Sequence, residues 1–391
     1  MPWNEVKPMD QRILFIADHL RDRYSFSELC SRYGISRKTG YKWLGRYRCD
    51  GVEGLEERSR RPHHSATAYP FAVRQAVIAL RTDGGDVLGP KKIQALLARR
   101  YPDMDVPSRT TIYLILKRAG LIEAQRRRRR VSPHPGALNN PSTPNGLWSA
   151  DYKGQFKLRN GQWCYPLTVM DHASRYLLGC QALAGTEFAP TRACFERLFR
   201  EHGLPERLRT DNGAPFASTG AAGLSRLSIW WIRLGIVPER IKPGRPQQNG
   251  RHERMHRTLK RAVTRPVAAD MPSQQQAFDQ FCQRYNEQRP HEGLEQNSPG
   301  SRYVRSVRAF PTKLPELEYP SYYECNKVAS GGLVYWRSMR IYIGYLLTGQ
   351  CVGFEPVGDG LWDVYFGPLR IGHFDERLMA GEKDDYLTLK V

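Results

Sequence analysis

"LWSADYKGQFKLRNGQWCYPLTVMDHASRYLLGCQAL", residues 147–183, alternates apolar and polar side chains over most of its length. Turn residues interrupt the alternation at Asn160–Gly161 and again at Asp171–Ser174. A period of two favours half-buried strands, and Asn-Gly favours the tight turn of a hairpin. The stretch therefore predicts an antiparallel meander of three strands.

The residues that follow predict helices mixed with short strands. We expect a helix over 188–202, a short strand ending at Asp211, a helix near 224–235 and a strand near Ile236. Strands that alternate with helices build a layered core in which the helices cover the sheet. The fold class of the centre, residues 145–305, is therefore α/β.

Charge and composition restrict the setting and the partners of the chain. Its 391 residues carry a formal net charge of +21, which indicates an anionic polymer or surface as partner. Eight cysteines without C-x-x-C spacing predict free thiols in a reducing, cytoplasmic setting and no structural zinc. No stretch has the length of a signal-peptide core or a membrane span, so no membrane partner is expected.

Residues 1–55 predict a helix-turn-helix unit. In "FSELCSRYGISRKTGYKWLGRY", residues 26–47, a helix is followed by a turn at Gly34 and a second helix that Ser36 caps. The second helix is basic, and we expect Arg37, Lys38 and Lys42 to contact DNA. An ordinary helical hairpin is the alternative.

A second helical unit is predicted over residues 70–125. Pro90 begins one helix, Ser108 caps the next in "RTTIYLILKRAG", and Gly120 ends it. The pattern suits another helix-turn-helix unit, winged or not, with Arg109 facing DNA.

Two basic linkers flank the second unit. The first, residues 56–69, contains Arg60 and Arg61 and is either an arm for the minor groove or a plain tether. The second, residues 126–144, begins with a basic run and continues with Pro-rich sequence that marks a domain boundary. We expect that run to neutralise DNA phosphates, although a solvated linker has the same composition. It consists of Arg126, Arg127, Arg128, Arg129 and Arg130.

The C-terminal residues 306–391 return to strand-like sequence. Several short apolar runs between 331 and 374 are separated by Gly. This pattern predicts a small β-barrel or sandwich.

Three acidic residues are candidates for chemistry. Asp151 lies in the middle of the first predicted strand, Asp211 precedes an Asn-Gly turn, and Glu253 lies near the start of a predicted helix. Each has an explanation without catalysis: a salt bridge for Asp151, a turn for Asp211 and the helix dipole for Glu253. Alternatively, three carboxylates from two strands and a helix suffice to hold a pair of Mg²⁺ ions, with Mn²⁺ expected to substitute.

The helix that carries Glu253 lies in "KPGRPQQNGRHERMHRTLKRAV", residues 242–263. Its apolar stripe is predicted to be buried and consists of Met255, Leu259, Ala262 and Val263. Another face carries Glu253, His256, Arg257 and Lys260. We expect the cations of that face, together with Arg251, to lie along the nucleic acid backbone.

Four blocks in this order resemble DDE-type insertion-sequence transposases with a retroviral-integrase-like core. They are "WSADYKG" (148–154), "RTDNGAPF" (209–216), "GRPQQNGRHERMHRTLK" (244–260) and "YNEQRPHEGLEQNSP" (285–299). The resemblance covers residues 140–305 well and implies an RNase H-like fold for the core. It also implies that Asp151, Asp211 and Glu253 are catalytic and bind metal.

Two features depart from that family. The interval from Asp211 to Glu253 is longer than usual, which we attribute to a small-residue insert at Ala217–Ser225. If the insert were elsewhere, Glu239 would be the nearest substitute for the third acid. The His/Cys zinc module of retroviral integrases is also absent from the sequence, so recognition of DNA ends would fall to the helix-turn-helix units.

The resemblance implies a Mg²⁺-dependent DNA transposase that cuts the ends of its element and joins the 3′-hydroxyl to target DNA. Its expected partners are double-stranded DNA and at least one further copy of the chain, without a nucleotide cofactor. One alternative is a sequence-specific DNA-binding regulator with a vestigial core. Another is a nuclease that hydrolyses DNA without joining it.

Overall fold

A computed structural model describes residues 8–58, 69–82, 87–122, 141–218, 220–241, 249–264, 266–337, 339–377 and 387–389. The chain divides into two compact units, Met1–Ala68 and Tyr69–Val391. Three sets of residues discussed above lie outside the described ranges: Arg60 and Arg61, the run Arg126–Arg130, and the loop 242–248.

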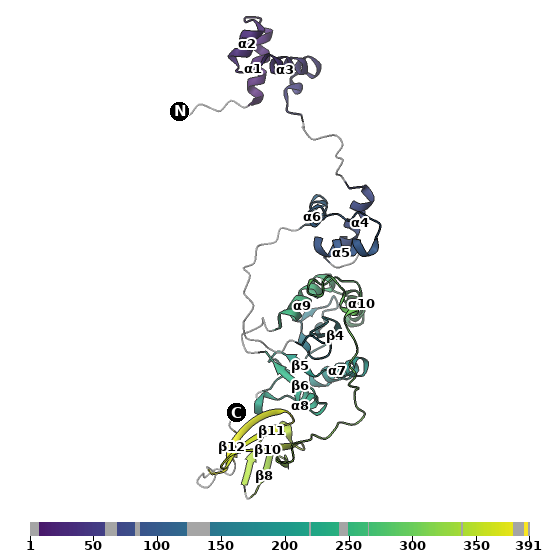
Figure 1. The fold of residues 1–391 in the computed structure, drawn as a ribbon, viewed down its shortest axis with the longest axis vertical. Coiled ribbons are helices and arrows are strands. Elements are labelled where there is room, and N and C mark those ends of the chain that lie inside the picture. Colours follow the sequence, from purple (N-terminus) through teal and green to yellow (C-terminus); the bar gives the residue numbers. More distant parts are fainter. Residues whose placement is uncertain are drawn as a thin grey trace. The chain divides into compact units, whose positions relative to one another are not determined.

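The first unit is a cluster of three α-helices, drawn in purple and blue in Figure 1: α1 (Pro8–Leu20), α2 (Phe26–Arg32) and α3 (Arg37–Asp50). A short 3₁₀ helix, η1 (Gly51–Leu55), follows them. Gly34 adopts a φ of 62° in the turn between α2 and α3, and the Ser36 hydroxyl accepts a hydrogen bond from the Thr39 amide. The predicted turn and cap are therefore confirmed.

The second unit begins with α4 (Phe71–Thr82), α5 (Pro90–Arg100) and α6 (Arg109–Arg118). Apolar side chains from all three helices share one core, including Val77, Ile93 and Ile112. Ser108 caps α6, as predicted. The described residues between 69 and 122 contain no strand that would form a wing.

The central sheet of the second unit contains the predicted meander. Its strands are β1 (Trp148–Tyr152), β2 (Phe156–Lys157), β3 (Trp163–Asp171), β4 (Leu177–Leu183), β5 (Arg207–Thr210) and β6 (Val237–Arg240). β1 and β4 both pair antiparallel with β3, and the short β2 pairs antiparallel with the first residues of β3. β5 then pairs parallel with β1, and β6 pairs parallel with β5.

Helices cover both faces of this sheet. α7 (Phe188–His202) and α8 (Arg226–Arg233) share a buried cluster with Trp148 and Ala150 of β1. α9 (Gly250–Val263) and α10 (Met271–Glu287) share another with Met170 and Cys180. Because successive side chains of a strand point to opposite faces, Ser149 and Asp151 lie on the α9 side of β1.

Two sheets make up the described C-terminal strands. One has the order β12 (Leu369–Asp375), β11 (Leu361–Phe366), β10 (Cys351–Gly358), β7 (Glu324–Lys327). The other has the order β13 (Leu387–Thr388), β9 (Met339–Tyr342), β8 (Leu333–Trp336). The β-rich character is therefore confirmed, whereas the predicted barrel or sandwich is not, because the described strands leave two open sheets. A shared apolar cluster joins their side chains to Ile229 and Ile232 of α8.

Among the described helices, none combines the length and the apolar character that crossing a bilayer requires.

Candidate active site

The sheet brings two of the candidate acids to neighbouring strand ends. Ser149 of β1 pairs with Arg209 of β5 in parallel register, and each acid follows two residues later, at Asp151 and Asp211. Parallel strands lie about 4.8 Å apart, so the two carboxylates reach the same edge of the sheet. Asp211 also makes the turn that its sequence predicts, since its Oδ1 accepts a hydrogen bond from the Gly213 amide at 3.1 Å.

The third acid comes from α9, which packs against β1 through its buried stripe. Met255, Leu259 and Val263 are buried as predicted, and Ala262 is half-buried. Glu253 lies in the first turn of α9 and is exposed. α9 covers the face of β1 that carries Asp151, and the charge of Glu253 acts on that carboxylate.

Electrostatics show that the three carboxylates are neighbours. Burial and then the negative charge of Asp211 raise the pKa of Asp151 to about 7, with a smaller contribution from Glu253 and an opposing one from Lys153. Such a pKa is expected where a buried acid has like charges nearby and too little positive charge to balance them. In the metal-free protein, Asp151 therefore holds its proton up to about neutral pH.

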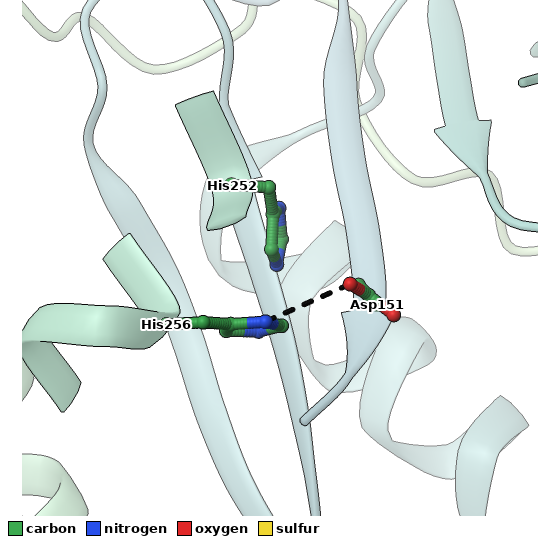
Figure 2. A group of neighbouring side chains, drawn as sticks. All are labelled: Asp151, His252 and His256. Atoms are coloured by element: carbon green, nitrogen blue, oxygen red, sulfur yellow. Dashed lines mark ion pairs between the residues drawn. The ribbon is translucent and has the colours of Figure 1, made fainter. Parts of the chain in front are cut away.

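Two histidines of α9, His252 and His256, lie beside Asp151, as Figure 2 shows. Nδ1 of His256 is 3.6 Å from Oδ2 of Asp151. This contact is an ion pair only when the imidazole is charged, and burial lowers the pKa of His256 to about 2, with smaller effects from His252 and Lys153. At neutral pH His256 is therefore neutral, and the contact is not an ion pair.

A threonine hydroxyl links the two imidazoles to the sheet. Oγ1 of Thr168, which lies opposite Asp151 in the β1–β3 register, is 2.7 Å from Nε2 of His252 and 2.7 Å from Nε2 of His256. The same hydroxyl donates to the backbone carbonyl oxygen of Asp151 at 2.9 Å. On the other side of its ring, Nδ1 of His252 lies 2.8 Å from the hydroxyl of Ser149.

Hydrogen-bond accounting assigns the protons of this network. The Thr168 hydroxyl has one proton, which the Asp151 carbonyl accepts, so it accepts from both imidazoles and both carry their proton on Nε2. His252 then accepts the Ser149 proton at Nδ1. The bare Nδ1 of His256 faces Asp151, so two acceptors oppose each other unless a proton or a cation resides on the carboxylate.

Within the described part of the chain, one group of potential metal-binding side chains has its ligand atoms within 4.8 Å of one another: Asp151, His252 and His256. The three acids do not form such a group, so the structure brings them to one edge of the sheet without converging them on one point. Both histidines direct Nε2 at Thr168, which leaves Nδ1 of His256 as the open nitrogen of the pair.

The structure corrects the expectation for His256 and shows the surroundings of Glu239. His256 was expected on the exposed cationic face of α9, but its side chain is 7% exposed and bonded to Thr168. Glu239, the alternative third acid, lies on β6 and forms a buried ion pair with Arg209 at 2.7 Å. Glu239 is therefore committed to a partner within the sheet.

Sequence reasoning missed His252, Thr168 and Ser149. At about 100° per residue around α9, His252 lies between Leu259 and Val263 of the apolar stripe, and His256 lies at its edge. Extending that stripe to include the polar rings would have predicted their burial. Their partners come from the strand alternation, because Ser149 shares the α9 face of β1 with Asp151, and Thr168 pairs with Asp151.

The other predicted DNA-binding residues that the structure describes lie at the surface. Arg37, Lys38 and Lys42 are exposed on α3, and Arg109 is exposed at the start of α6. On α9, Arg257 and Lys260 are exposed, whereas Arg251 is half-buried and donates to the His172 carbonyl oxygen at 2.7 Å. These exposures are compatible with DNA contact.

Family models match both the helical N-terminal part of the chain and its central part. Integrase core domain models match residues 141–246 and 234–299. A helix-turn-helix domain model matches residues 11–63, and a homeodomain-like domain model matches residues 39–116.

Curated relatives come from insertion elements and retroviruses. The insertion element IS407 31.7 kDa protein of Burkholderia multivorans is 27% identical over 56% of this chain and 76% of its own length. The insertion element IS476 39.2 kDa protein of Xanthomonas euvesicatoria is 24% identical over 52% of this chain and 56% of its own length. The Gag-Pol polyprotein of baboon endogenous virus is 26% identical over 46% of this chain and 10% of its own length. Among solved structures, the HTLV-2 integrase catalytic core domain in complex with magnesium matches 41% of this chain and 98% of its own, with 16% identity and a TM-score of 0.33.

The chain thus matches helix-turn-helix models in its N-terminal part and integrase core models in its centre. The resemblance to insertion-sequence transposases with a retroviral-integrase-like core is confirmed by the family models and by the insertion-element relatives.

Proposed function

We propose that this chain is a DNA transposase that cuts the ends of its mobile element and joins the freed 3′-hydroxyl to target DNA. The observation that carries the proposal is that the negative charges of Asp211 and Glu253 both raise the pKa of Asp151, whose strand β1 lies beside β5. The matches to integrase core models and to insertion-element proteins support the same reaction class.

The residues at this edge fit a hard divalent cation. Asp151 has two other carboxylates as electrostatic neighbours, and its raised pKa reports uncompensated negative charge that a cation would balance. Oxygen ligands of this kind suit Mg²⁺, and Mn²⁺ accepts the same ligands. We propose that Asp151, Asp211 and Glu253 hold two Mg²⁺ ions, which supply Lewis-acid stabilisation of the attacking and leaving oxygens when bound.

The protein side of the reaction is positioning. β1 and β5 fix Asp151 and Asp211 on adjacent strands, and the Thr168 network holds α9, and with it Glu253, against β1. Arg257 and Lys260 on the exposed side of α9 would attract the phosphates of the DNA strand. In each step one phosphorus–oxygen bond forms as another breaks. Water first frees the 3′-hydroxyl, and that hydroxyl then displaces a 3′-oxygen in target DNA.

Recognition of the element ends is proposed to lie in the two helical units. The exposed basic residues on α3 and at the start of α6 are suited to contact DNA, as is typical of the second helix in a helix-turn-helix. Because two element ends are joined together, we propose that the active assembly contains at least two copies of the chain.

The test is a strand-transfer assay with purified protein, labelled element-end duplex, plasmid target and Mg²⁺. We expect cut and joined products, which differ in length, and no product from Asp151→Asn. The matched control is Asp270→Asn, because Asp270 caps α10 away from the three acids and asparagine also serves as an N-cap.

Each outcome distinguishes a reaction class. Tight duplex binding without cutting would favour a regulator with a vestigial core, and cutting without joining would favour a nuclease. Undiminished joining by Asp151→Asn would overturn the assignment of the first acid.

A further inference from the structure

An imidazole nitrogen of α9 faces the carboxylate of the first acid. Nδ1 of His256 lies 3.6 Å from Oδ2 of Asp151, along the dashed line in Figure 2. Because the proton of His256 is on Nε2, where Thr168 accepts it, Nδ1 presents a lone pair to the carboxylate. A carboxylate oxygen and an imidazole lone pair that face each other are both potential ligands for one cation.

The separation of these two atoms fits a shared metal ion better than a hydrogen bond. A hydrogen bond between nitrogen and oxygen spans about 2.7–3.2 Å, which is shorter than this contact. Small divalent ions hold carboxylate oxygens and imidazole nitrogens at about 2.0–2.2 Å, so two ligands of one ion lie up to about 4.4 Å apart. The distance of 3.6 Å between His256 and Asp151 therefore allows both to contact the same ion.

The other side of the His256 ring is arranged as in a metal-binding histidine. Such histidines donate their second ring N–H to an oxygen, which fixes the tautomer and the orientation of the ring. Here the acceptor is the Thr168 hydroxyl, 2.7 Å from Nε2, and that hydroxyl donates to the backbone carbonyl oxygen of Asp151 at 2.9 Å. One chain of hydrogen bonds thus holds both potential ligands in place.

His252 lies close to the same atoms, but its ring nitrogens are already engaged. A ligand atom of His252 is within 4.8 Å of those of Asp151 and His256. However, Nε2 of His252 is 2.7 Å from the Thr168 hydroxyl, and Nδ1 is 2.8 Å from the Ser149 hydroxyl. His252 is also fully buried, so its place is behind the ligands and not among them.

The sequence of α9 pairs His256 with the third acid. Glu253 and His256 are three residues apart, so they lie about 60° apart around the helix and about 4.5 Å apart along it. Glu-x-x-His is the spacing with which helices of di-iron and di-manganese carboxylate proteins supply a carboxylate and an imidazole to their metal site. The negative charge of Glu253 also acts on Asp151, so both members of the motif are neighbours of that carboxylate.

We propose that Nδ1 of His256 is a ligand of the cation held by Asp151, so that one metal position has a nitrogen ligand among its oxygens. The inference rests on the proposed function for the presence of a cation at Asp151, but it concerns ligation alone. Imidazole is a ligand of transition metals, including manganese, whereas Mg²⁺ takes oxygen ligands. Compared with carboxylates alone, His256 therefore shifts the preference of this position from Mg²⁺ towards Mn²⁺.

Electron spin-echo spectroscopy of bound Mn²⁺ tests the assignment without any catalysis. The full chain is loaded with Mn²⁺ in the absence of DNA, once with ordinary nitrogen and once with ¹⁵N-labelled histidine. A nitrogen nucleus bonded to Mn²⁺ modulates the echo, and the modulation differs between ¹⁴N and ¹⁵N. We expect a ¹⁴N modulation that ¹⁵N-histidine replaces. Absence of bound Mn²⁺, or bound Mn²⁺ without a coupling to histidine, would overturn the proposal without recourse to any variant.

Two glutamine variants assign the nitrogen to one ring. His256→Gln places an amide N–H near the position of Nε2, so it retains a donor to Thr168 but removes Nδ1. The matched control, His252→Gln, makes the same change one turn earlier and also retains a donor to Thr168. We expect the histidine coupling to disappear from bound Mn²⁺ in His256→Gln and to persist in His252→Gln. Any other pattern overturns the assignment to His256.

Competition between the two metals gives a second readout. Mg²⁺ is titrated against bound Mn²⁺, and the ratio of the two affinities is compared between variants. The preference for Mn²⁺ should fall in His256→Gln and stay at the wild-type value in His252→Gln. An unchanged ratio in His256→Gln would contradict a nitrogen ligand at this position.

These measurements are independent of the strand-transfer assay. If no DNA is joined but the histidine coupling appears as expected, the proposed function fails and the ligand assignment stands. If joining proceeds and Mn²⁺ shows no coupling to histidine, the reverse holds.

Discussion

Replacing Asp151 with asparagine should stabilise the metal-free protein while abolishing its chemistry. The pKa of Asp151 rises from an ordinary value of 3.8 to about 7 on folding, first because of burial and then because of Asp211. A folded-state pKa above the unfolded one means that the folded state loses stability as pH rises from about 4 to about 7. At about 1.4 kcal/mol for each unit of pKa, the ionised carboxylate destabilises the fold by about 4 kcal/mol at pH 8. At pH 5, the Asp151 carboxyl group destabilises the fold by about 2 kcal/mol.

Asparagine has nearly the same shape and never ionises, so the variant should recover that free energy. Hydrogen exchange of the β1 and β3 amides, compared between variant and wild type at one pH with EDTA, measures the local unfolding free energy without requiring the whole chain to unfold in one step. We expect protection to increase in Asp151→Asn at pH 8, less at pH 5, and not in Asp270→Asn, whose carboxylate has a lowered pKa. Equal protection of wild type and Asp151→Asn at pH 8, or a gain that is the same at pH 5, would refute the reasoning.

Three further predictions concern the same face of the sheet. Thr168→Val leaves the Nε2 protons of His252 and His256 without an acceptor, which costs about 1–3 kcal/mol for each proton. Urea unfolding should therefore show a free energy of unfolding that is lower by about 2–6 kcal/mol. Thr168→Ser keeps the hydroxyl and should restore this free energy. Mg²⁺ affinity measured by calorimetry should fall about tenfold for each pH unit below 7, because protonated Asp151 cannot bind metal. An affinity that does not change between pH 8 and pH 5.5 would contradict this prediction. Glu239→Gln breaks the buried ion pair with Arg209 and should reduce the free energy of unfolding by about 3 kcal/mol or more. The folded fraction of this variant should still carry out strand transfer. Loss of joining in the folded variant would instead identify Glu239 as the third acid.

The elements that carry the acids were predictable because local patterns determine them. Alternation over 147–183 gave β1, β3 and β4, and helical spacing placed Met255 and Leu259 in the core. The local interpretation of Asp211 as a turn residue was also correct, since its carboxylate bonds the Gly213 amide. Asp211 can therefore both make a turn and belong to the candidate site, because the turn directs its carboxylate at the end of β5.

The remaining features depend on contacts between residues far apart in the sequence. Nothing near His252 indicates that a hydroxyl from Thr168, 84 positions earlier, completes its hydrogen bonds. Whether the C-terminal strands close into a barrel depends equally on which strand edges meet. Alternation and glycine punctuation predict strands, but not their partners, and the described strands form two sheets.

The three acids differ in how firmly the fold fixes them, and this difference bears on how the site assembles. Asp151 belongs to β1 and Asp211 directly follows β5, so the parallel pairing of these strands sets their approximate spacing. Glu253 is exposed on α9, and its approach to the strands depends on side chains: the apolar stripe and the two imidazoles that bond Thr168. Because like charges oppose the approach of Glu253 to Asp151, a cation that neutralises them would favour a close arrangement of α9 and β1. Convergence of the acids would then accompany metal binding, which is consistent with a structure in which they share one edge of the sheet but not one point.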